Sequence, residues 1–299
     1  MFFPRVSARR VPPFRVLPGE RRGALLAGID PGRSRGLEFG PLTSPLVGRQ
    51  EGAIEYVDHA TSEELREKYA SDPNVDVAAI VAVDHVLESG RLPASIPMAA
   101  YGYVIACHVF EHLPDPLGWL TEIATRLEPG GRLCLAVPDK RFTFDRLREP
   151  TRLAEWVEAL LEHRCRPSPR SVFDAAMLSV SLPLAVTWSR PASRAELRPQ
   201  GEGQAGWALG LARQAADEYF DVHCSIFTPA SCLTLLAETA ELGLHPFALA
   251  GFGDTPRGSF EFFLQLLLAK EQPGPARARA FREAAESAHA GSPYDRLAG

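Results

Sequence analysis

Two histidines and a glutamate stand close together in the segment His108-Val109-Phe110-Glu111-His112, and a third histidine, His223, lies farther along the chain. Imidazole and carboxylate groups bind divalent metals and transfer protons near neutral pH. The spacing keeps the first three of these side chains within about five residues of one another, a little more than one helical turn. These four residues are therefore the first candidates for a catalytic or metal-binding role.

The order His-x-x-Glu-His is also the order of the zinc ligands in one class of peptidases. That use requires both histidines on one face of a continuous helix. Here an apolar run leads directly into His108, while Pro114 and Pro116 follow His112, so a long helix does not fit. A metal-dependent hydrolase that uses His108, Glu111 and His112 stays a remote alternative.

The elements around this cluster form a strand-helix-strand unit in residues 101–145. Residues 103–107 are a short apolar run that polar residues follow, which is typical of a buried parallel strand. Apolar residues recur at helical spacing over 117–127, and the Glu-Pro-Gly-Gly sequence at 128–131 ends that helix. Residues 133–137 predict the next strand. Ligands of parallel sheets bind at the carboxyl ends of the strands, where the cluster falls.

Three more strands are predicted upstream, at 36–40, 54–58 and 77–83. Each carries an acid at or near its end: Glu38 lies in the first, Asp58 ends the second and Asp84 follows the third. The remaining predicted elements are helices at 62–69 and from 228 to 243, and strands at 245–250 and 260–268. This order of strands and helices predicts a doubly wound α/β fold.

The amino-acid composition indicates the class of protein to which the chain belongs. The 299 residues are 45% hydrophobic and 23% charged, as in ordinary globular proteins. The 32 basic and 37 acidic residues give a net charge of −5, which argues against nucleic acid as a partner. The five cysteines form no Cys-x-x-Cys pair, so a reducing, cytoplasmic location is expected. No apolar stretch is long enough to span a membrane, so no membrane partner is expected.

Shifts in composition divide the chain into five predicted segments. Proline and arginine dominate the beginning, a loop-rich stretch follows the strand at 133–137, and alanine, arginine, glycine and proline dominate the end. The predicted segments are an extended arm at 1–24, an α/β core at 25–145, a helical cap and acceptor region at 146–225, the remainder of the core at 226–271 and a mobile tail at 272–299.

The segment from Phe110 to Pro138, with FEHLPDP followed by LEPGGRLCLAVP, resembles class I S-adenosylmethionine-dependent methyltransferases. The resemblance extends over 25–145 and 226–270. It implies a Rossmann-like, mostly parallel, seven-stranded sheet with an inserted helical cap. It also implies S-adenosylmethionine as cofactor and methyl transfer to a small-molecule acceptor, at oxygen first and at nitrogen next.

The cofactor loop departs from the family pattern, which reads acid-x-Gly-x-Gly-x-Gly. This chain has Glu38-Phe39-Gly40-Pro41-Leu42-Thr43-Ser44, so the acid and the first glycine match and the other two glycines do not. The resemblance implies that Asp58 binds the ribose hydroxyls and that Asp84 contacts the adenine amino group. The full set of implied cofactor-binding residues is Glu38, Gly40, Pro41, Asp58, His59, Asp84 and Cys107.

Some methyltransferases, among them small-RNA 2′-O-methyltransferases and ubiquinone-pathway O-methyltransferases, carry Glu-x-x-Glu-His where this chain has His108 to His112. In those enzymes the motif and a later histidine are associated with a divalent metal that holds the acceptor oxygen. Glu111 and His112 match, His223 lies in the corresponding later position, and His108 replaces the first glutamate. The resemblance thus implies a metal at Glu111, His112 and His223, and imidazole ligands favour zinc, manganese or iron over magnesium.

Without a metal, the same histidines are the candidates for a base that removes the acceptor proton. His108, His112 and His223 all qualify, and His108 comes first because it ends the strand at 103–107. The altered glycine loop keeps a second hypothesis open, namely a non-catalytic or repurposed cofactor-binding protein with a methyltransferase fold. The sequence fixes neither the acceptor nor the oligomeric state.

Overall fold

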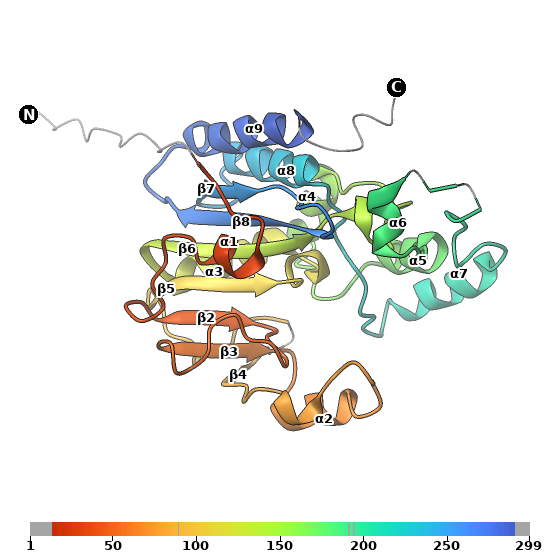
Figure 1. The fold of residues 1–299 in the computed structure, drawn as a ribbon, viewed down its shortest axis with the longest axis horizontal. Coiled ribbons are helices and arrows are strands. Elements are labelled where there is room, and N and C mark those ends of the chain that lie inside the picture. The colour runs from red at the N-terminus through yellow and green to blue at the C-terminus, as the bar shows by residue number, and fades with distance from the viewer. Residues whose placement is uncertain (1–13, 89, 191, 194, 291–299) are drawn as a thin grey trace, which may run out of the picture.

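The computed structural model describes residues 14–290, except residues 89, 191 and 194. Its strands are β1 (Arg15–Val16), β2 (Gly36–Phe39), β3 (Ile54–Asp58), β4 (His85–Val86), β5 (Tyr101–Cys107), β6 (Leu127–Pro138), β7 (Phe247–Gly253) and β8 (Glu261–Leu268). They form one sheet in the order β1-β7-β8-β6-β5-β2-β3-β4 (Figure 1). β8 runs antiparallel to both of its neighbours, and the other pairs of described strands are parallel. The predicted doubly wound, mostly parallel α/β fold is confirmed.

Nine α-helices accompany the sheet in the described part of the chain. They are α1 (Arg21–Leu25), α2 (Ser62–Lys68), α3 (Pro116–Arg126), α4 (Leu153–Leu161), α5 (Pro169–Leu178), α6 (Leu184–Ser189), α7 (Ala205–Gln214), α8 (Pro229–Glu241) and α9 (Gly274–Ala290). The helix predicted from residue 228 starts as expected, because the Thr228 side chain accepts a hydrogen bond from the backbone of Ser231 and Pro229 occupies the first helical position.

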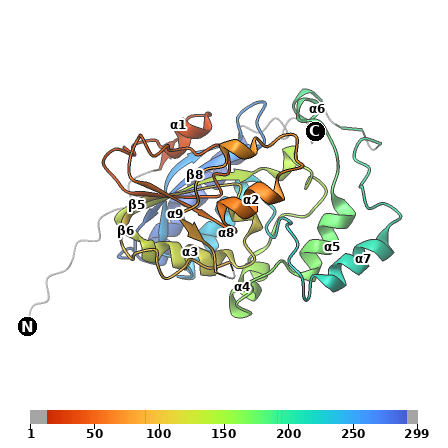
Figure 2. The same cartoon turned by 90° about the horizontal axis from the view of Figure 1, so that it is seen from below.

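Each face of the sheet has its own hydrophobic core, because successive side chains of a strand point to opposite faces. In β5, Val104 and Ala106 pack into a cluster with residues of α3, α8 and α9. Tyr103 and Ile105 face a smaller cluster with residues of α1 and with Val47. Figure 2 shows α1 on one side of the sheet and α3 and α8 on the other. The carboxyl ends of the parallel strands are thus held between two packed layers.

The third upstream strand is shorter and later than the sequence predicts. The apolar run at 77–83 contains a 3-10 helix, η1 (Val77–Ala79), and the strand that joins the sheet is β4. The Asp76 side chain accepts a hydrogen bond from the Ala78 backbone and stabilises the turn. Within the run only Ile80 is buried, whereas Ala78, Ala79 and Ala82 are exposed, so its apolar residues do not form a buried strand.

The segment before β2 lies against β7 and β8. β1 pairs with β7 through Arg15 and Gly251, which adds an eighth strand to the seven predicted. Gln265 of β8 donates hydrogen bonds to the carbonyl groups of Ala24, Leu25 and Ala27, in and just after α1. Residues 14–24 of the predicted arm are therefore attached to the sheet, with Leu17 and Ala24 buried, and residues 1–13 lie outside the described residues.

The C-terminal segment, predicted to be mobile, contains the long helix α9. Its Ala278, Phe281, Ala284 and Ala288 are buried against α8. These residues recur at intervals of three and four, which is the spacing of one helix face. The alanine-rich composition thus reflects close helix packing. Residues 291–299 lie outside the described residues.

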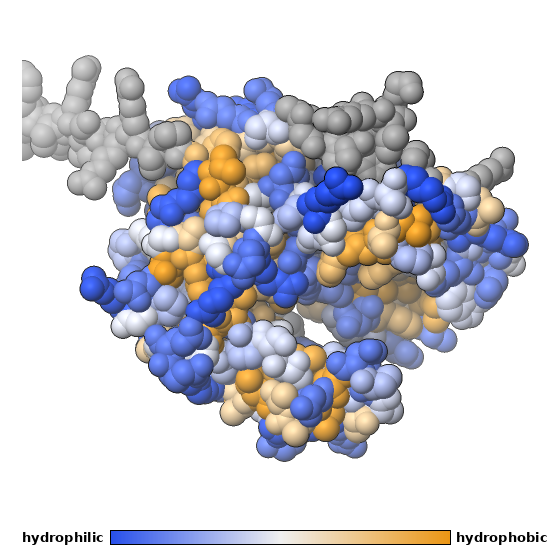
Figure 3. Space-filling view, in the orientation of Figure 1, coloured by the Kyte–Doolittle hydropathy of each residue, from blue (hydrophilic) through white to orange (hydrophobic). Residues whose placement is uncertain are grey.

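Helices α4 to α7 follow β6 and form the predicted helical cap beside the carboxyl ends of the strands (Figure 1). The surface is hollowed between this cap and the side of the sheet that carries α2 (Figure 3). Among the described residues, no helix has both the length and the apolar character needed to cross a membrane.

Candidate active site

Strand register brings several predicted cofactor residues to one edge of the sheet. Phe39 pairs with Val57 on one side and with Ala106 on the other. The residues that follow these three, namely Gly40, Asp58 and Cys107, therefore lie at one level, at the carboxyl ends of β2, β3 and β5. Burial raises the pKa of the Cys107 thiol to about 12, so this side chain stays protonated.

Glu38 lies below that edge and fixes the loop that follows β2. Its carboxylate accepts hydrogen bonds from the backbone of Leu46, at 2.7 Å, and of Val47, at 3.3 Å. The side chain is buried, and burial raises its pKa to about 7 even though the two backbone donors act in the opposite direction. Glu38 thus shapes the predicted cofactor loop from below.

The loop after β2 has left-handed backbone angles at two positions, although only one of the two residues is glycine. Gly40 has φ of +59° and Leu42 has φ of +46°, both in the left-handed region. Leu42 occupies the place of the second family glycine, so a branched side chain adopts a conformation that glycine usually supplies. No helix forms between β2 and β3 within residues 41–53. Pro41 lies between the two left-handed residues, and Ser44 occupies the place of the third family glycine.

Asp58 and His59 form a pair at the end of β3. Asp58 is buried, and its Oδ1 accepts a hydrogen bond from the His59 backbone at 2.7 Å and lies 2.6 Å from His59 Nδ1. His59 in turn lies 3.1 Å from Lys68 Nζ of α2. The acid that the resemblance assigns to the ribose is therefore at the predicted edge of the sheet.

Asp84 is not at that edge. Its backbone N–H bonds to the carbonyl of Tyr56, two residues before the end of β3, so it precedes β4 and does not follow it. Its carboxylate accepts hydrogen bonds from the Tyr56 backbone, at 2.8 Å, and from Arg49, at 2.7 Å. Two residues of a strand span about 6.6 Å. The expectation of Asp84 at the strand end was wrong, because the strand itself lies later in the chain.

His108 follows β5 with φ of +53° and contacts two carboxylates. Its Nε2 lies 2.8 Å from Glu261 of β8, and its Nδ1 lies 3.5 Å from Glu111. Arg21 of α1 binds the same Glu261 with two nitrogens, at 2.9 and 2.8 Å. Burial alone would lower the pKa of His108, but the two carboxylates raise it to about 9. At neutral pH the ring is thus a cation, which makes His108 a poorer base than its position predicts.

Glu111, His112 and His223 form the compact cluster that the sequence predicts. Glu111 and His112 lie in the 3-10 helix η2 (Phe110–His112), and His223 lies just before α8. One ligand atom from each side chain falls within 4.8 Å of the others. The rings of His112 and His223 meet edge to face, with centroids 4.6 Å apart. His108 is outside this group, so the three residues of the hydrolase alternative do not converge.

The Glu111 carboxylate is buried without a hydrogen bond to either oxygen. Its Oε1 lies 4.0 Å from Nε2 of both His112 and His223. His108 Nδ1 lies 3.5 Å from the same carboxylate, but no hydrogen bond satisfies its two buried oxygens. Burial without hydrogen bonds is costly, and a bound cation would lower that cost. The two imidazoles and one carboxylate are a donor set for zinc, manganese or iron. The residues present therefore fit a divalent metal at Glu111, His112 and His223.

Two carboxylates that the sequence analysis did not single out support the histidines of the cluster. Asp145, after β6, lies with its Oδ2 2.5 Å from His223 Nδ1. Asp221, from the loop before α8, lies with its Oδ1 2.9 Å from His112 Nδ1. Burial lowers the pKa of His112, but the contact with Asp221 outweighs it and the net pKa is raised. These acids are distant in sequence from the motif, so no local pattern marks them.

A cavity of about 260 Å³ opens onto the cluster. Its remaining walls are mainly apolar and aromatic. The lining residues are His108, Glu111, His112, Pro138, Phe142, Thr143, Phe144, His223 and Phe260. Phe144 lies 4.9 Å from the His223 ring, and Phe260 lies 5.4 Å from the His108 ring. The cavity thus combines a polar floor with flat apolar walls.

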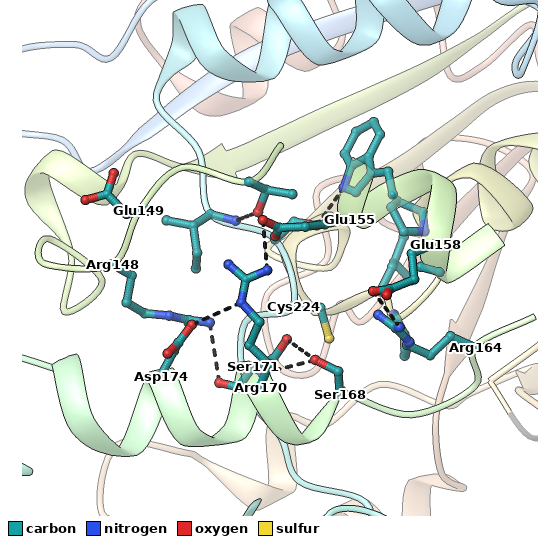
Figure 4. A pocket seen from close by; sticks show the side chains of 18 of the residues that line it. Arg148, Glu149, Glu155, Glu158, Arg164, Ser168, Arg170, Ser171, Asp174 and Cys224 are labelled. Atoms are coloured by element: carbon teal, nitrogen blue, oxygen red, sulfur yellow. Dashed lines mark hydrogen bonds and ion pairs between the residues drawn. The ribbon is translucent and has the colours of Figure 1, made fainter. Parts of the chain in front are cut away.

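A second cavity, of about 420 Å³, lies among α4, α5 and the segment that follows His223 (Figure 4). Its lining is rich in ion pairs: Arg164 contacts Glu158 at 3.2 Å, and Arg170 contacts Glu155 at 2.9 Å. Arg148 also lines it, buried, with an Nε that has no hydrogen-bond partner. Charged groups in this second cavity are thus mostly paired with one another.

Comparison with solved structures gives several methyltransferases. The trans-methyltransferase CalH complexed with SAH has 17% identity and a TM-score of 0.39, over 83% of this chain and 55% of that chain. The CcbJ methyltransferase from Streptomyces caelestis has 20% identity and a TM-score of 0.30, over 41% and 53%. An S-adenosylmethionine-dependent methyltransferase from Mesorhizobium loti has 11% identity and a TM-score of 0.43, over 83% and 98%.

This chain spans about half the length of CalH and CcbJ. No curated protein matches it in sequence. Residues 18–176 match the family model described as a methyltransferase domain, which is more than half of the 299 residues. This match shows the family: the protein belongs to the methyltransferase-domain family, whose methyl donor is S-adenosylmethionine.

Proposed function

We propose that the protein transfers a methyl group from S-adenosylmethionine to the hydroxyl group of a small acceptor, with a divalent metal held by Glu111, His112 and His223. One observation carries the proposal. The Glu111 carboxylate is buried beside two imidazoles, and neither of its oxygens has a hydrogen-bond partner. In a methyltransferase, such a group in the wall of the smaller cavity is best explained as a cation ligand near the acceptor.

The reaction sets the requirements for the site. The acceptor oxygen attacks the methyl carbon, the bond between that carbon and sulfur breaks, and sulfur keeps the electron pair in S-adenosylhomocysteine. The hydroxyl proton leaves to a base. A bound metal would lower the pKa of the acceptor hydroxyl and orient it. Alignment of donor and acceptor then supplies most of the remaining rate enhancement.

The chain's own residues divide these tasks. His108 is held as a cation by Glu261 and Glu111, so it suits electrostatic anchoring of the loop after β5 better than proton removal. His223 has its Nδ1 engaged by Asp145, which leaves Nε2 as the atom that can bind a metal or accept a proton. We therefore assign the base or ligand role to His223 ahead of His108.

The acceptor class follows from the smaller cavity. Its volume of about 260 Å³ is below the range of roughly 300–1,000 Å³ that is usual for drug-sized ligands. Phe142, Phe144 and Phe260 supply flat apolar walls. We infer a small acceptor with one ring or a similar apolar body and a hydroxyl group, with an amine as the next choice.

The test uses metal-stripped protein, S-adenosylmethionine and a panel of small hydroxyl compounds, with S-adenosylhomocysteine as the measured product. Mn²⁺ or Zn²⁺ should restore product formation, and a chelator should abolish it. Glu111→Gln and His223→Ala should lower turnover and leave the dissociation constant for S-adenosylmethionine unchanged. Full activity of metal-stripped protein would show that the reaction needs no metal. A fully active His223→Ala variant would show that His223 only packs against its neighbours.

A second candidate is a cofactor-binding protein without transfer activity. The loop after β2 supports it, because Leu42 and Ser44 replace two glycines of the family pattern and no helix follows the loop within residues 41–53. Titration calorimetry with S-adenosylmethionine and S-adenosylhomocysteine separates the two functions. Binding of both compounds without product from any acceptor or metal would favour this candidate, and binding of neither would exclude both.

A further inference from the structure

The His223 ring is held on one side by a buried carboxylate from a distant segment. Asp145 is 78 residues earlier in the chain and lies with its Oδ2 2.5 Å from His223 Nδ1. Only 2% of Asp145 and 8% of His223 are exposed to solvent. The other oxygen of this carboxylate, Oδ1, is bound by Arg148, so Oδ2 is placed to accept the Nδ1–H of the ring.

Arg148 fixes both partners of this contact. Its Nη1 donates to Asp145 Oδ1 at 2.8 Å, and its Nη2 donates to the backbone carbonyl of His223 at 2.9 Å. Arg148 is itself only 4% exposed. A planar guanidinium with two directed donors holds a carboxylate and a carbonyl at a fixed separation, which a lysine cannot do. The ring is thus located by its Nδ1–H and by its own backbone.

The consequence concerns the other ring nitrogen. With the proton on Nδ1, the lone pair of neutral His223 is on Nε2, which lies 4.0 Å from Glu111 Oε1 and belongs to the three-residue cluster. A metal-binding histidine commonly donates its second N–H to a carboxylate, and that partner fixes the tautomer and orients the ring. The arrangement of Asp145 and His223 has this form.

We propose that Asp145 and Arg148 are positioning residues, which set the tautomer and the orientation of His223 so that Nε2 binds the metal. This inference rests on the proposed metal site. Neither residue touches the metal or the acceptor in this scheme, and both act through His223. Arg148 also lines the larger cavity, beside residues of α4 and α5.

The test is the affinity of metal-stripped protein for Mn²⁺, measured by titration calorimetry. Asp145→Asn keeps the shape of the side chain, but its amide can donate to Nδ1 and so stabilise the tautomer that carries the proton on Nε2. We expect Mn²⁺ to bind about 10- to 100-fold more weakly to this variant, the range usual for removal of such a partner. The visible absorption of the Co²⁺-loaded variant should also change, because the ligand field at the metal changes.

The matched control is Asp139→Asn. Asp139 is also fully buried, follows the same strand and is bound by an arginine, Arg141, at 2.6 Å, but it is not in contact with His223. It should lose stability in the same way and keep the wild-type Mn²⁺ affinity. If Asp145→Asn does not fold, Arg148→Lys is measured in its place. We expect this variant to bind Mn²⁺ more weakly than wild type, and an unchanged affinity would contradict the proposal.

The outcomes separate the two proposals. Wild-type protein that binds no Mn²⁺, Zn²⁺ or Co²⁺ overturns both the metal site and this inference. Wild-type binding together with an Asp145→Asn variant of equal affinity overturns only the positioning role. An equal loss in Asp145→Asn and Asp139→Asn also overturns it, because the effect would then follow from general destabilisation.

Discussion

Replacement of Glu38 by glutamine should remove a pH dependence of stability that originates below the cofactor loop. The Glu38 carboxylate is buried, and burial raises its pKa to about 7 from the usual 4.5, against the effect of two backbone donors. In the unfolded chain the group ionises near the usual value. Between these two pH values the native protein keeps a proton that the unfolded chain has lost.

The sign and size follow from proton linkage. Because the folded pKa is the higher one, the stabilising contribution is complete below about pH 4.5 and is lost as the pH rises through 7. Each pH unit between the two pKa values corresponds to roughly 1.4 kcal/mol. The free energy of unfolding of wild type relative to Glu38→Gln should therefore fall by about 3 kcal/mol between about pH 4 and about pH 8.

The measurement is urea denaturation of both proteins at a series of pH values, with the difference in unfolding free energy as the result. Other titrating groups cancel in this difference, since both proteins contain them. Glu128→Gln, at an exposed position, serves as the control and should show no such trend. If the difference in unfolding free energy between wild type and Glu38→Gln does not change with pH, the pKa of Glu38 is not raised. If wild type instead becomes more stable relative to the variant as the pH rises, the pKa of Glu38 is lowered by folding.

Three other predictions concern separate parts of the molecule. Asp58→Ala should weaken S-adenosylmethionine binding about 10- to 100-fold in calorimetry, because charge-assisted hydrogen bonds are lost, and unchanged affinity would remove Asp58 from the cofactor site. Glu261→Gln should lower the pKa of His108 by about one to three pH units in an NMR titration, since burial is then less compensated; a pKa still near 9 would contradict the network. Phe281→Ala should lower the unfolding free energy by about 3–5 kcal/mol in denaturant titration, and a loss below about 1 kcal/mol would mean that α9 is not part of the core.

The sequence predicts the elements whose signals are local. The apolar run of β5 and the Thr228-Pro229 start of α8 are present where expected, because pattern and capping chemistry agree with the tertiary environment. The run at 77–83 misleads because the edge of a sheet does not need a continuous apolar strand, and the Asp76 cap favours a turn. The spacing of Ala278, Phe281 and Ala288 held the signal for α9, but the alanine- and arginine-rich composition favoured a mobile tail.

Some residues of the candidate site can likewise be predicted from local sequence signals, and others cannot. Glu111 and His112 are adjacent in the motif, and His223 could be placed by its position before α8. No local sequence signal predicts the carboxylates that contact the histidines of the site, which are Asp145, Asp221 and Glu261. They approach from segments whose arrangement depends on the whole sheet. The charge state of His108 could not be predicted either, since it depends on two carboxylates brought together only by folding.

The contacts between the first and the last strands govern when the molecule can fold. β1 needs β7 as its partner, and α1 is held by Gln265 and Glu261 of β8, about 240 residues later. Contacts of such long range slow folding, because a large loop must close before they contribute. During synthesis the N-terminal half would wait, with one sheet face uncovered, until β8 leaves the ribosome. Phe260, which supplies one wall of the small cavity, directly precedes β8, so the acceptor pocket is also incomplete until this late segment has been made.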